Sequence, residues 1–207
     1  YDVNTVLNAT MAKLADTVTA PAFGTNAGEW TVLSLARGGH FAADDAYFAD
    51  YYDRIVETVN AKAASVNKNG ALHKAKSTDN SRLIVALSAI GKDATCVGDW
   101  DLTAPYSDFD WIKNQGINGA IWALIALDSN NYETEDTELR QTLVNRILNS
   151  QHDDGGWHLN YANLTVPSNV DITGMTLTAL YPYRNQPEVA AACAEAIAWL
   201  SSAQQAD

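Results

Sequence analysis

The sequence predicts an all-α protein made of repeated helical hairpins, in which amphipathic outer helices surround buried inner helices. Three observations support this prediction. Apolar residues recur every three or four positions along several segments, as expected for helices with one buried face. Other segments are apolar on nearly all sides, which a helix tolerates only when most of its faces are covered. Segments of this second kind repeat along the chain, which is typical of arrays that bury each unit against the next.

The amphipathic segments begin near the N-terminus. Between Val3 and Val18, apolar residues recur at steps of four, four, three and four positions, which places them on one face of a helix. Pro21 and Gly24 are then expected to end this helix. The same pattern is found in residues 44–66, 139–147 and 189–200.

The segments that are apolar on nearly all sides carry a repeat. Leu33, Leu87, Leu124 and Leu177 occupy matching places in them, at intervals of 54, 37 and 53 residues. The short interval coincides with residues 91–116, whose Gly, Pro and Asp content predicts a loop with a short helix near 108–113. The segments themselves are residues 30–36, 83–90, 117–127 and 170–180.

The composition excludes several classes of protein. The 207 residues include 13 Lys and Arg against 25 Asp and Glu, a formal net charge of −12, whereas nucleic-acid binding requires a basic face. A hydrophobic content of 47% excludes intrinsic disorder. No apolar run of about 18 residues is available to span a membrane. Two cysteines, Cys96 and Cys193, are too few for a disulfide framework or a thiolate metal cluster.

A second repeat concerns the C-terminal end of the chain. The segment RILNSQHDDGGW at 146–157 is echoed by WLSSAQQAD at 199–207, so that Gln151 matches Gln204 and Asp154 matches Asp207. The echo stops before its Gly-Gly-aromatic sequence. We therefore expect residues 1–207 to form a single domain that is a fragment, continuing beyond Asp207 into a further hairpin.

Gln151, Gly155 and Trp157 match the QW motif, a Gln followed by Gly-x-Trp, and thereby resemble the terpenoid cyclase and protein prenyltransferase superfamily. The segments GEWTVLSLARGG, SRLIVALSAIGKD and QGINGAIWALIALDSNNY resemble the squalene-cyclase-like repeat domains of bacterial cell-surface proteins. The resemblance covers about residues 3–207. It implies an α/α toroid, here incomplete, and in such a motif the Gln side chain is expected to satisfy exposed amides at the next helix start.

The resemblance implies a function and a location. We expect a non-catalytic scaffold or ligand-binding domain of a secreted or wall-attached bacterial protein, joined to further domains of the same polypeptide. A purely structural spacer is a rival interpretation. The motifs are specific for the fold and poorly specific for activity.

Class II cyclases of the superfamily protonate an alkene with the middle Asp of an Asp-x-Asp-Asp-Thr motif. The matching stretch here, residues 169–173, keeps only Asp171, because Asn169 and Ile172 replace the flanking carboxylates. A strong acid needs such hydrogen-bonded partners. The alternative hypothesis is therefore a divergent cyclase-like enzyme that uses Asp171 as general acid in an apolar cavity.

No metal or cofactor is expected. Protein prenyltransferases hold zinc with an Asp and a Cys two residues later, and Thr173 stands at the position of that thiolate. The histidines show no metal-ligand spacing and are expected to be solvated or capping residues; they are His40, His73, His152 and His158.

In a toroid the starts of the inner helices converge on one end of the ring. The resemblance therefore implies a binding concavity at that end. Aromatic walls with a few polar groups suit a small molecule, and the animal vitamin B12 carriers use a similar barrel, so a small apolar or corrinoid-like ligand is expected. The tryptophans have a second interpretation as core, and the aspartates as helix caps. The candidate ligand-binding residues are Glu29, Trp30, Asp79, Arg82, Asn118, Trp122, Trp157 and Met175, with Asp171 beside them.

Overall fold

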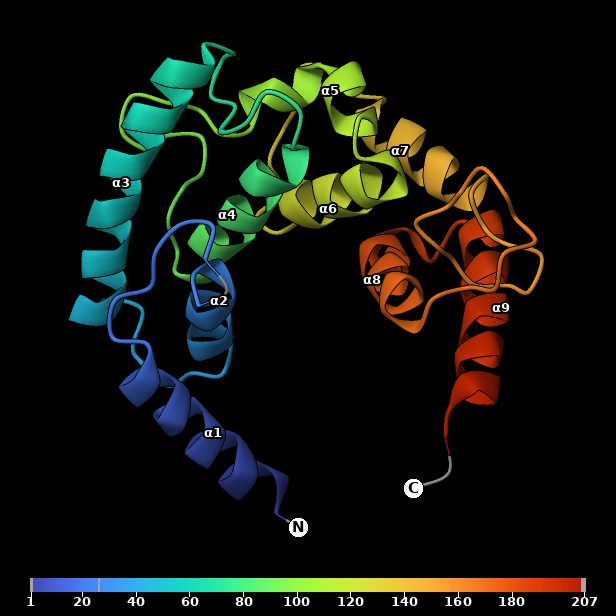
Figure 1. Ribbon diagram of the computed structural model, residues 1–207, viewed down its shortest axis with the longest axis horizontal. Coiled ribbons are helices and arrows are strands. Elements are labelled where there is room, and N and C mark those ends of the chain that lie inside the picture. The colour runs from blue at the N-terminus through green and yellow to red at the C-terminus, as the bar shows by residue number, and fades with distance from the viewer. Residues whose placement is uncertain (1, 26, 206–207) are drawn as a thin grey trace. The chain divides into compact units, whose positions relative to one another are not determined.

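The computed structural model describes residues 2–25 and 27–205, and these residues form helices and loops without a strand (Figure 1). The all-α prediction is confirmed, whereas the toroid stays a prediction. Each segment that the sequence predicted as helical lies in a helix to within one or two residues. The α-helices are α1 (Val3–Thr17), α2 (Glu29–Arg37), α3 (Ala46–Val66), α4 (Ser77–Ala89), α5 (Phe109–Lys113), α6 (Gly116–Asp128), α7 (Leu139–Leu148), α8 (Val170–Leu180) and α9 (Pro187–Ala203), and the 3-10 turns are η1 (Ala104–Ser107) and η2 (Tyr181–Tyr183).

The chain divides into two compact units. The first comprises the described residues of 1–74 together with 79–105, and the second comprises 75–78 together with those of 106–207. Helix α4 begins in the second unit with Ser77 and Thr78 and continues in the first. The single domain expected from the sequence stays a prediction.

In the first unit, α3 and α4 differ in how they are buried. Helix α3 buries one face, because its buried residues from Phe48 to Ala63 follow one another at steps of three or four positions. Helix α4 is buried at every position from Leu83 to Leu87. This contrast agrees with the expected distinction between amphipathic and buried helices.

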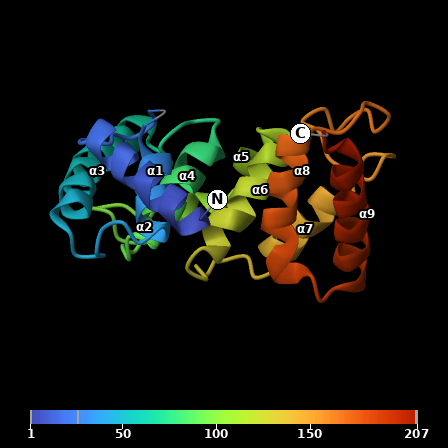
Figure 2. The ribbon, with the colours of Figure 1, turned by 90° about the horizontal axis from the view of Figure 1, so that it is seen from below.

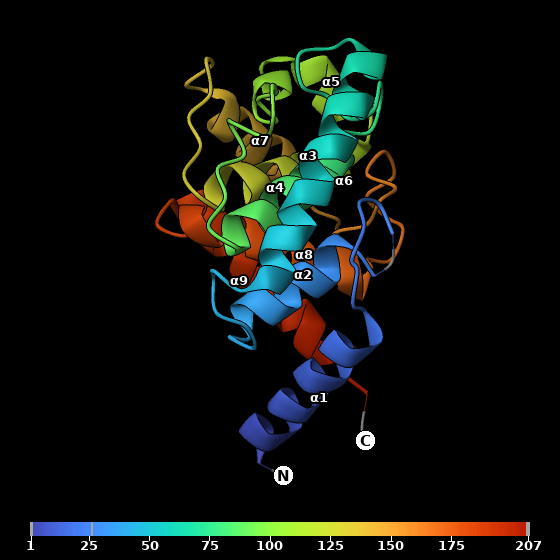
Figure 3. The same ribbon diagram turned by 90° about the vertical axis from the view of Figure 1, so that its left-hand side faces the viewer.

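Helix α1 differs from its expected packing. Val3 is 75% exposed and Leu7 46% exposed, and Met11 is the buried residue of this helix. Met11 packs against Gly38, where a β-carbon would collide with its sulfur atom. Figures 1 and 3 show the start of α1 extending away from α2 and α3, so Val3 and Leu7 are uncovered, whereas Leu14 and Val18 are half-buried.

The second unit packs around α6. This helix contacts α5, α7 and α8, and its residues Ile117, Ile121 and Leu124 are fully buried or nearly so. Helices α8 and α9 lie side by side (Figure 2). Segment 170–180, which we expected to be covered on nearly all sides, is instead half-buried: Val170 is 53% exposed. Helices α6 and α9 cover only the other side, which carries Ile172, Thr173, Thr176 and Ala179.

Asn80 of α4 joins two loops of the first unit. Its side chain is fully buried, its oxygen accepts a hydrogen bond from the Leu72 amide at 2.9 Å, and its nitrogen donates to the carbonyls of Gly70 and Leu102, both at 3.0 Å. One side chain therefore satisfies three backbone groups, which would otherwise be costly to bury.

Candidate functional site

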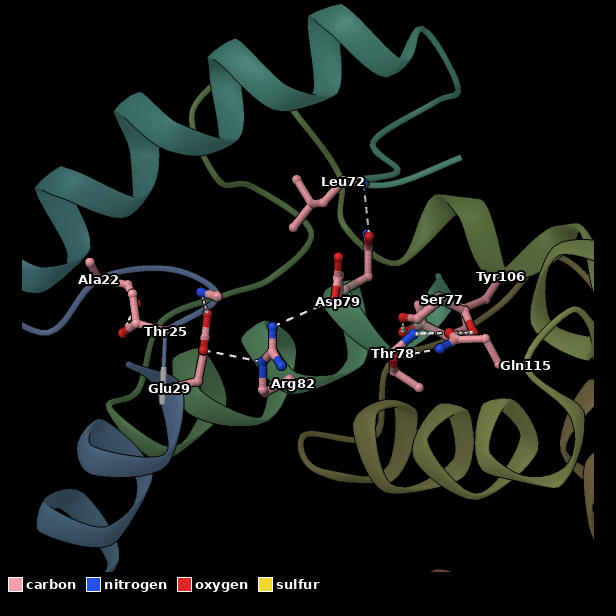
Figure 4. Close-up of polar contacts among 12 residues, drawn as sticks. Ala22, Thr25, Glu29, Leu72, Ser77, Thr78, Asp79, Arg82, Tyr106 and Gln115 are labelled. Carbon is pink, nitrogen blue, oxygen red and sulfur yellow. Dashed lines mark hydrogen bonds and ion pairs between the residues drawn. The ribbon is translucent and has the colours of Figure 1, made fainter. Parts of the chain in front are cut away.

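Three of the predicted ligand-binding residues meet in the first unit, and we call Glu29, Asp79 and Arg82 the Glu29 cluster (Figure 4). The Arg82 Nε lies 3.1 Å from Glu29 Oε2, and Arg82 Nη2 lies 3.5 Å from Asp79 Oδ1. The contact with Glu29 is an ion pair without an aligned N–H, because neither of its two atoms makes a hydrogen bond with any residue that the structure describes. Glu29 is 1% exposed, whereas the side chains of Arg82 and Asp79 are 25% and 23% exposed.

The sequence explains the position of Glu29. It is the first residue of α2, where the helix dipole favours a negative charge. Its Oε1 accepts a hydrogen bond from the Gly24 amide at 2.9 Å, and Gly24 has a positive φ of 74° that suits glycine. Arg82 comes from α4, so the carboxylate ties the loop before α2 to a second helix. The cluster therefore has a structural role whether or not it binds a ligand.

Tyr51 of α3 belongs to the surroundings of this cluster. Burial of its hydroxyl, followed by the negative charge of Glu29, raises the pKa of Tyr51 far above its ordinary value, while Arg82 and Arg54 oppose the shift. The phenol is fully buried and its hydroxyl makes no hydrogen bond with the described residues. Tyr51 is therefore a neutral core residue at physiological pH.

The predicted tryptophans occupy different environments. Trp30 of α2 is 40% exposed, so it is not a core residue. Trp157 is fully buried, its indole Nε1 donates to the Ile147 carbonyl at 2.9 Å, and its amide donates to Thr173 Oγ1 at 2.9 Å. Trp157 thus fits the interpretation as core. Trp122 is half-buried on α6.

The remaining predicted residues lie in the second unit. Asn118 of α6 and Met175 of α8 are half-buried. Asp171 is exposed in the first turn of α8. It does not cap this helix, because Asn169 takes that role by accepting a hydrogen bond from the Ile172 amide at 3.0 Å. The nine predicted residues are thus divided between the two units, and the shared concavity stays a prediction.

The QW motif forms a loop that is held by side chains. Gln151 Nε2 donates to the carbonyls of Gly155 at 2.7 Å and Ala192 at 3.0 Å. The expectation that this side chain would accept from amides at a helix start is therefore wrong, because the groups within its reach are carbonyls. The second of them lies in α9, 41 positions along the chain.

The expected role is filled by Gln115 instead. Its Oε1 accepts a hydrogen bond from the Thr78 amide at 2.9 Å, and its Nε2 donates to Thr78 Oγ1 at 3.0 Å, at the start of α4 (Figure 4). Sequence reasoning did not single out this residue. The signal that would have found it is its place before Gly116, at the start of a buried helix, in one of the segments that carry the resemblance.

Asp154 and His152 fix the turn of the same loop. Asp154 accepts hydrogen bonds from the Ser168 hydroxyl, the Ser168 amide at 2.9 Å and the Gly156 amide at 3.2 Å. Burial acts to raise the pKa of Asp154, and these hydrogen bonds outweigh it, so the pKa lies below its ordinary value. His152, expected to be solvated or capping, is only 3% exposed, and its Nδ1 lies 2.6 Å from the Val166 carbonyl.

Three surface cavities are lined by other residues, which sequence reasoning missed. The first, of about 350 Å³, is lined by Phe109, Ser150 and a polar row on α7 and its C-cap Asn149. That row, at positions 142, 145, 146 and 149, has helical spacing, which would have identified it. The second, of about 470 Å³, follows Val3, Val6, Leu7 and Thr10, and the third, of about 320 Å³, is lined by Glu133, Thr134, Thr137 and Arg140.

Within the described residues, no group of three or more His, Cys, Asp or Glu side chains is placed to hold a metal ion. Cys96 is exposed, Cys193 is half-buried, and both are free thiols. None of the described helices combines the length and the apolar character needed to cross a membrane. No family model, no curated protein and no solved structure matches the chain.

We expect Arg82→Met to lower the free energy of unfolding by about 3 kcal/mol, because it leaves the Glu29 carboxylate buried without its cation. Glu29→Gln should cost less, about 1 kcal/mol, since the amide oxygen still accepts from Gly24 and Arg82 keeps Asp79. Urea denaturation measures both values. Lys113→Met is the matched control, because Lys113 pairs with Asp110 on the exposed surface. An Arg82→Met effect no larger than that of Lys113→Met would contradict the buried pair.

The lowered pKa of Asp154 predicts a pH dependence. Its contribution to stability is complete above the ordinary pKa of 3.8 and is lost as the pH falls through the lower value of the folded state. The difference in unfolding free energy between wild type and Asp154→Asn should therefore be constant from about pH 7 to 5 and shrink below about pH 4. Asp153→Asn controls for the loss of one charge. A difference that grows on acidification would refute the assignment.

Proposed function

We propose that the chain is a non-catalytic helical scaffold of a secreted or wall-attached bacterial protein, and that it carries a surface for a small ligand. The proposal places it in the terpenoid cyclase and prenyltransferase superfamily, as an incomplete α/α toroid. It is supported by the sequence resemblance, by the helical architecture, and by the contrast between the one-faced burial of α3 and the complete burial of α4 at positions 83–87.

The observation that carries the proposal is the environment of Asp171. An acid that protonates an alkene needs a water-free cavity and hydrogen-bonded neighbours, because these keep its proton in place until the substrate reacts. Asp171 is instead exposed to solvent, next to exposed Val170 and to Asn169, whose side chain is engaged in capping α8. This environment favours a helix-terminal carboxylate over a general acid.

The other polar residues at helix starts also make structural contacts. Glu29 holds the Gly24 amide and Arg82, and Gln115 holds the start of α4. A catalytic group must be available to the substrate, whereas these groups are engaged within the protein. A scaffold requires such contacts, because they fix loops against helices.

Ligand binding is proposed for the outer part of the Glu29 cluster. Trp30 follows Glu29 in α2 with an exposed indole, and Asp79 and Arg82 each keep about a quarter of their side-chain surface open to solvent. An exposed aromatic ring with a charged pair suits a ligand that has an apolar body and polar edges, as a corrinoid does.

The test is an assay in which the chain is incubated with squalene and with geranylgeranyl diphosphate, and the products are analysed by gas chromatography and mass spectrometry. We expect no cyclised product from the wild type or from Asp171→Asn, because Asp171 is exposed to solvent and the flanking carboxylates of the cyclase motif are replaced by Asn169 and Ile172. Titration with cyanocobalamin or farnesol should give a heat of binding that Trp30→Ala abolishes and Tyr181→Ala, which removes another exposed ring, preserves.

A cyclised product that disappears in Asp171→Asn would overturn the non-catalytic assignment and establish the cyclase-like alternative. If neither ligand binds, the ligand surface at the Glu29 cluster is refuted, and the proposed function is reduced to that of a scaffold. Circular dichroism of each variant checks that the helices are retained.

A further inference from the structure

The cavity on α7 lies outside the residues discussed so far as ligand-binding. It has a volume of about 350 Å³ and belongs entirely to the second unit. Phe109 of α5 supplies an aromatic wall, and the other lining residues are polar. They are Thr142, Asn145, Arg146, Asn149 and Ser150.

Arg146 is the only charged residue among those that line this cavity. Its guanidinium carbon lies 5.3 Å from the centre of the Tyr161 ring, and its Nε is buried without a hydrogen-bond partner in the described part of the chain. No described carboxylate lies within ion-pair distance of Arg146. The cation is thus held in place by an aromatic ring and has no counter-ion among residues 2–25 and 27–205.

The lack of a carboxylate is notable in this chain. Asp and Glu outnumber Lys and Arg by 25 to 13, and Arg82 and Arg140 are both paired with carboxylates. A partly buried guanidinium without an acceptor is costly, and an anion restores the lost interaction through charge-assisted hydrogen bonds. The third half-buried arginine, Arg54, also has a buried Nε without a hydrogen-bond partner among the described residues, but its Nη2 donates to the Pro21 carbonyl at 3.5 Å and it lines none of the three cavities. Arg146 is therefore better suited to an external anion than Arg54, Arg82 and Arg140.

We propose that this cavity binds a small hydroxylated monocarboxylate whose carboxylate pairs with Arg146. A single cation matches one negative charge, whereas phosphate groups are bound by several donors and charges. Asn149 and Thr142 make no side-chain hydrogen bonds with the described residues, so the amide and the hydroxyl are available for ligand hydroxyls. Phe109 suits the apolar face of a sugar-like ring or chain, and the volume lies at the lower end of small-molecule sites.

The test is isothermal titration calorimetry of the chain with D-glucuronate, gluconate and lactate. D-glucose serves as the uncharged analogue of glucuronate, and inorganic phosphate as the competing anion. We expect at least one carboxylate to bind, and its affinity to fall about tenfold or more in Arg146→Gln, because a charge-assisted hydrogen bond is lost. Asn149→Asp should weaken binding similarly, since it adds a negative charge beside the ligand carboxylate, and Asn149 is exposed, so the fold tolerates the change.

Arg184→Gln is the matched control. Arg184 also stacks on a tyrosine, with its guanidinium carbon 4.0 Å from the centre of the Tyr181 ring, but it lines none of the three cavities. Its loss should leave binding unchanged.

Four results would overturn the proposal: no binding of any of the three carboxylates, equal binding of glucose and glucuronate, tighter binding of phosphate, or equal losses in Arg146→Gln and Arg184→Gln. If Arg146→Gln does not fold, Asn149→Asp decides between the outcomes. This test is independent of the proposed function. The ligand surface proposed there is the Glu29 cluster of the first unit, whereas the α7 cavity belongs to the second unit.

Discussion

The backbone groups at the junctions between loops and buried helices need hydrogen-bond partners, and amide side chains provide many of them in this chain. Asn80 satisfies three such groups, Gln115 holds the start of α4, Gln151 joins its loop to α9, and Asn169 caps α8. An unpaired buried amide or carbonyl costs free energy comparable to a lost hydrogen bond. These four side chains therefore determine where the loops meet the helices within each unit.

This constraint explains why the motifs are more informative about structure than about activity. Gln151 and Trp157 of the QW motif are engaged in the loop and the core, and Asn169 of the cyclase-like stretch is a helix cap. The resemblance supports a scaffold because the residues that carry it have structural partners. Function must then be sought at side chains that lack such partners within the described part of the chain, as the Nε of Arg146 does.

The helices could be predicted from the sequence, because apolar periodicity and local turn residues are properties of short segments. Burial could be predicted less well. Helix α1 has a regular apolar stripe, yet its first part, with Val3 and Leu7, is exposed, and α8 also has an exposed side. Coverage depends on neighbouring helices rather than on the segment itself.

The candidate site could be predicted in part. Glu29, Asp79 and Arg82 come together, and their charges and places at helix starts were visible in the sequence. The partner of Gln151 in α9 lies 41 positions away. Arg146 of α7 contacts Tyr161 in the segment between α7 and α8. Neither contact follows from local spacing.

The central claim, that amide side chains fix the junctions between loops and buried helices, is tested most directly by native-state hydrogen exchange in Gln115→Met. The substitution keeps the size of the side chain and removes its hydrogen bonds. The account predicts faster exchange of the Thr78 amide, with the Ile172 amide, which Asn169 holds, unchanged. Unchanged protection of Thr78 would contradict the claim and assign the helix start to apolar packing alone.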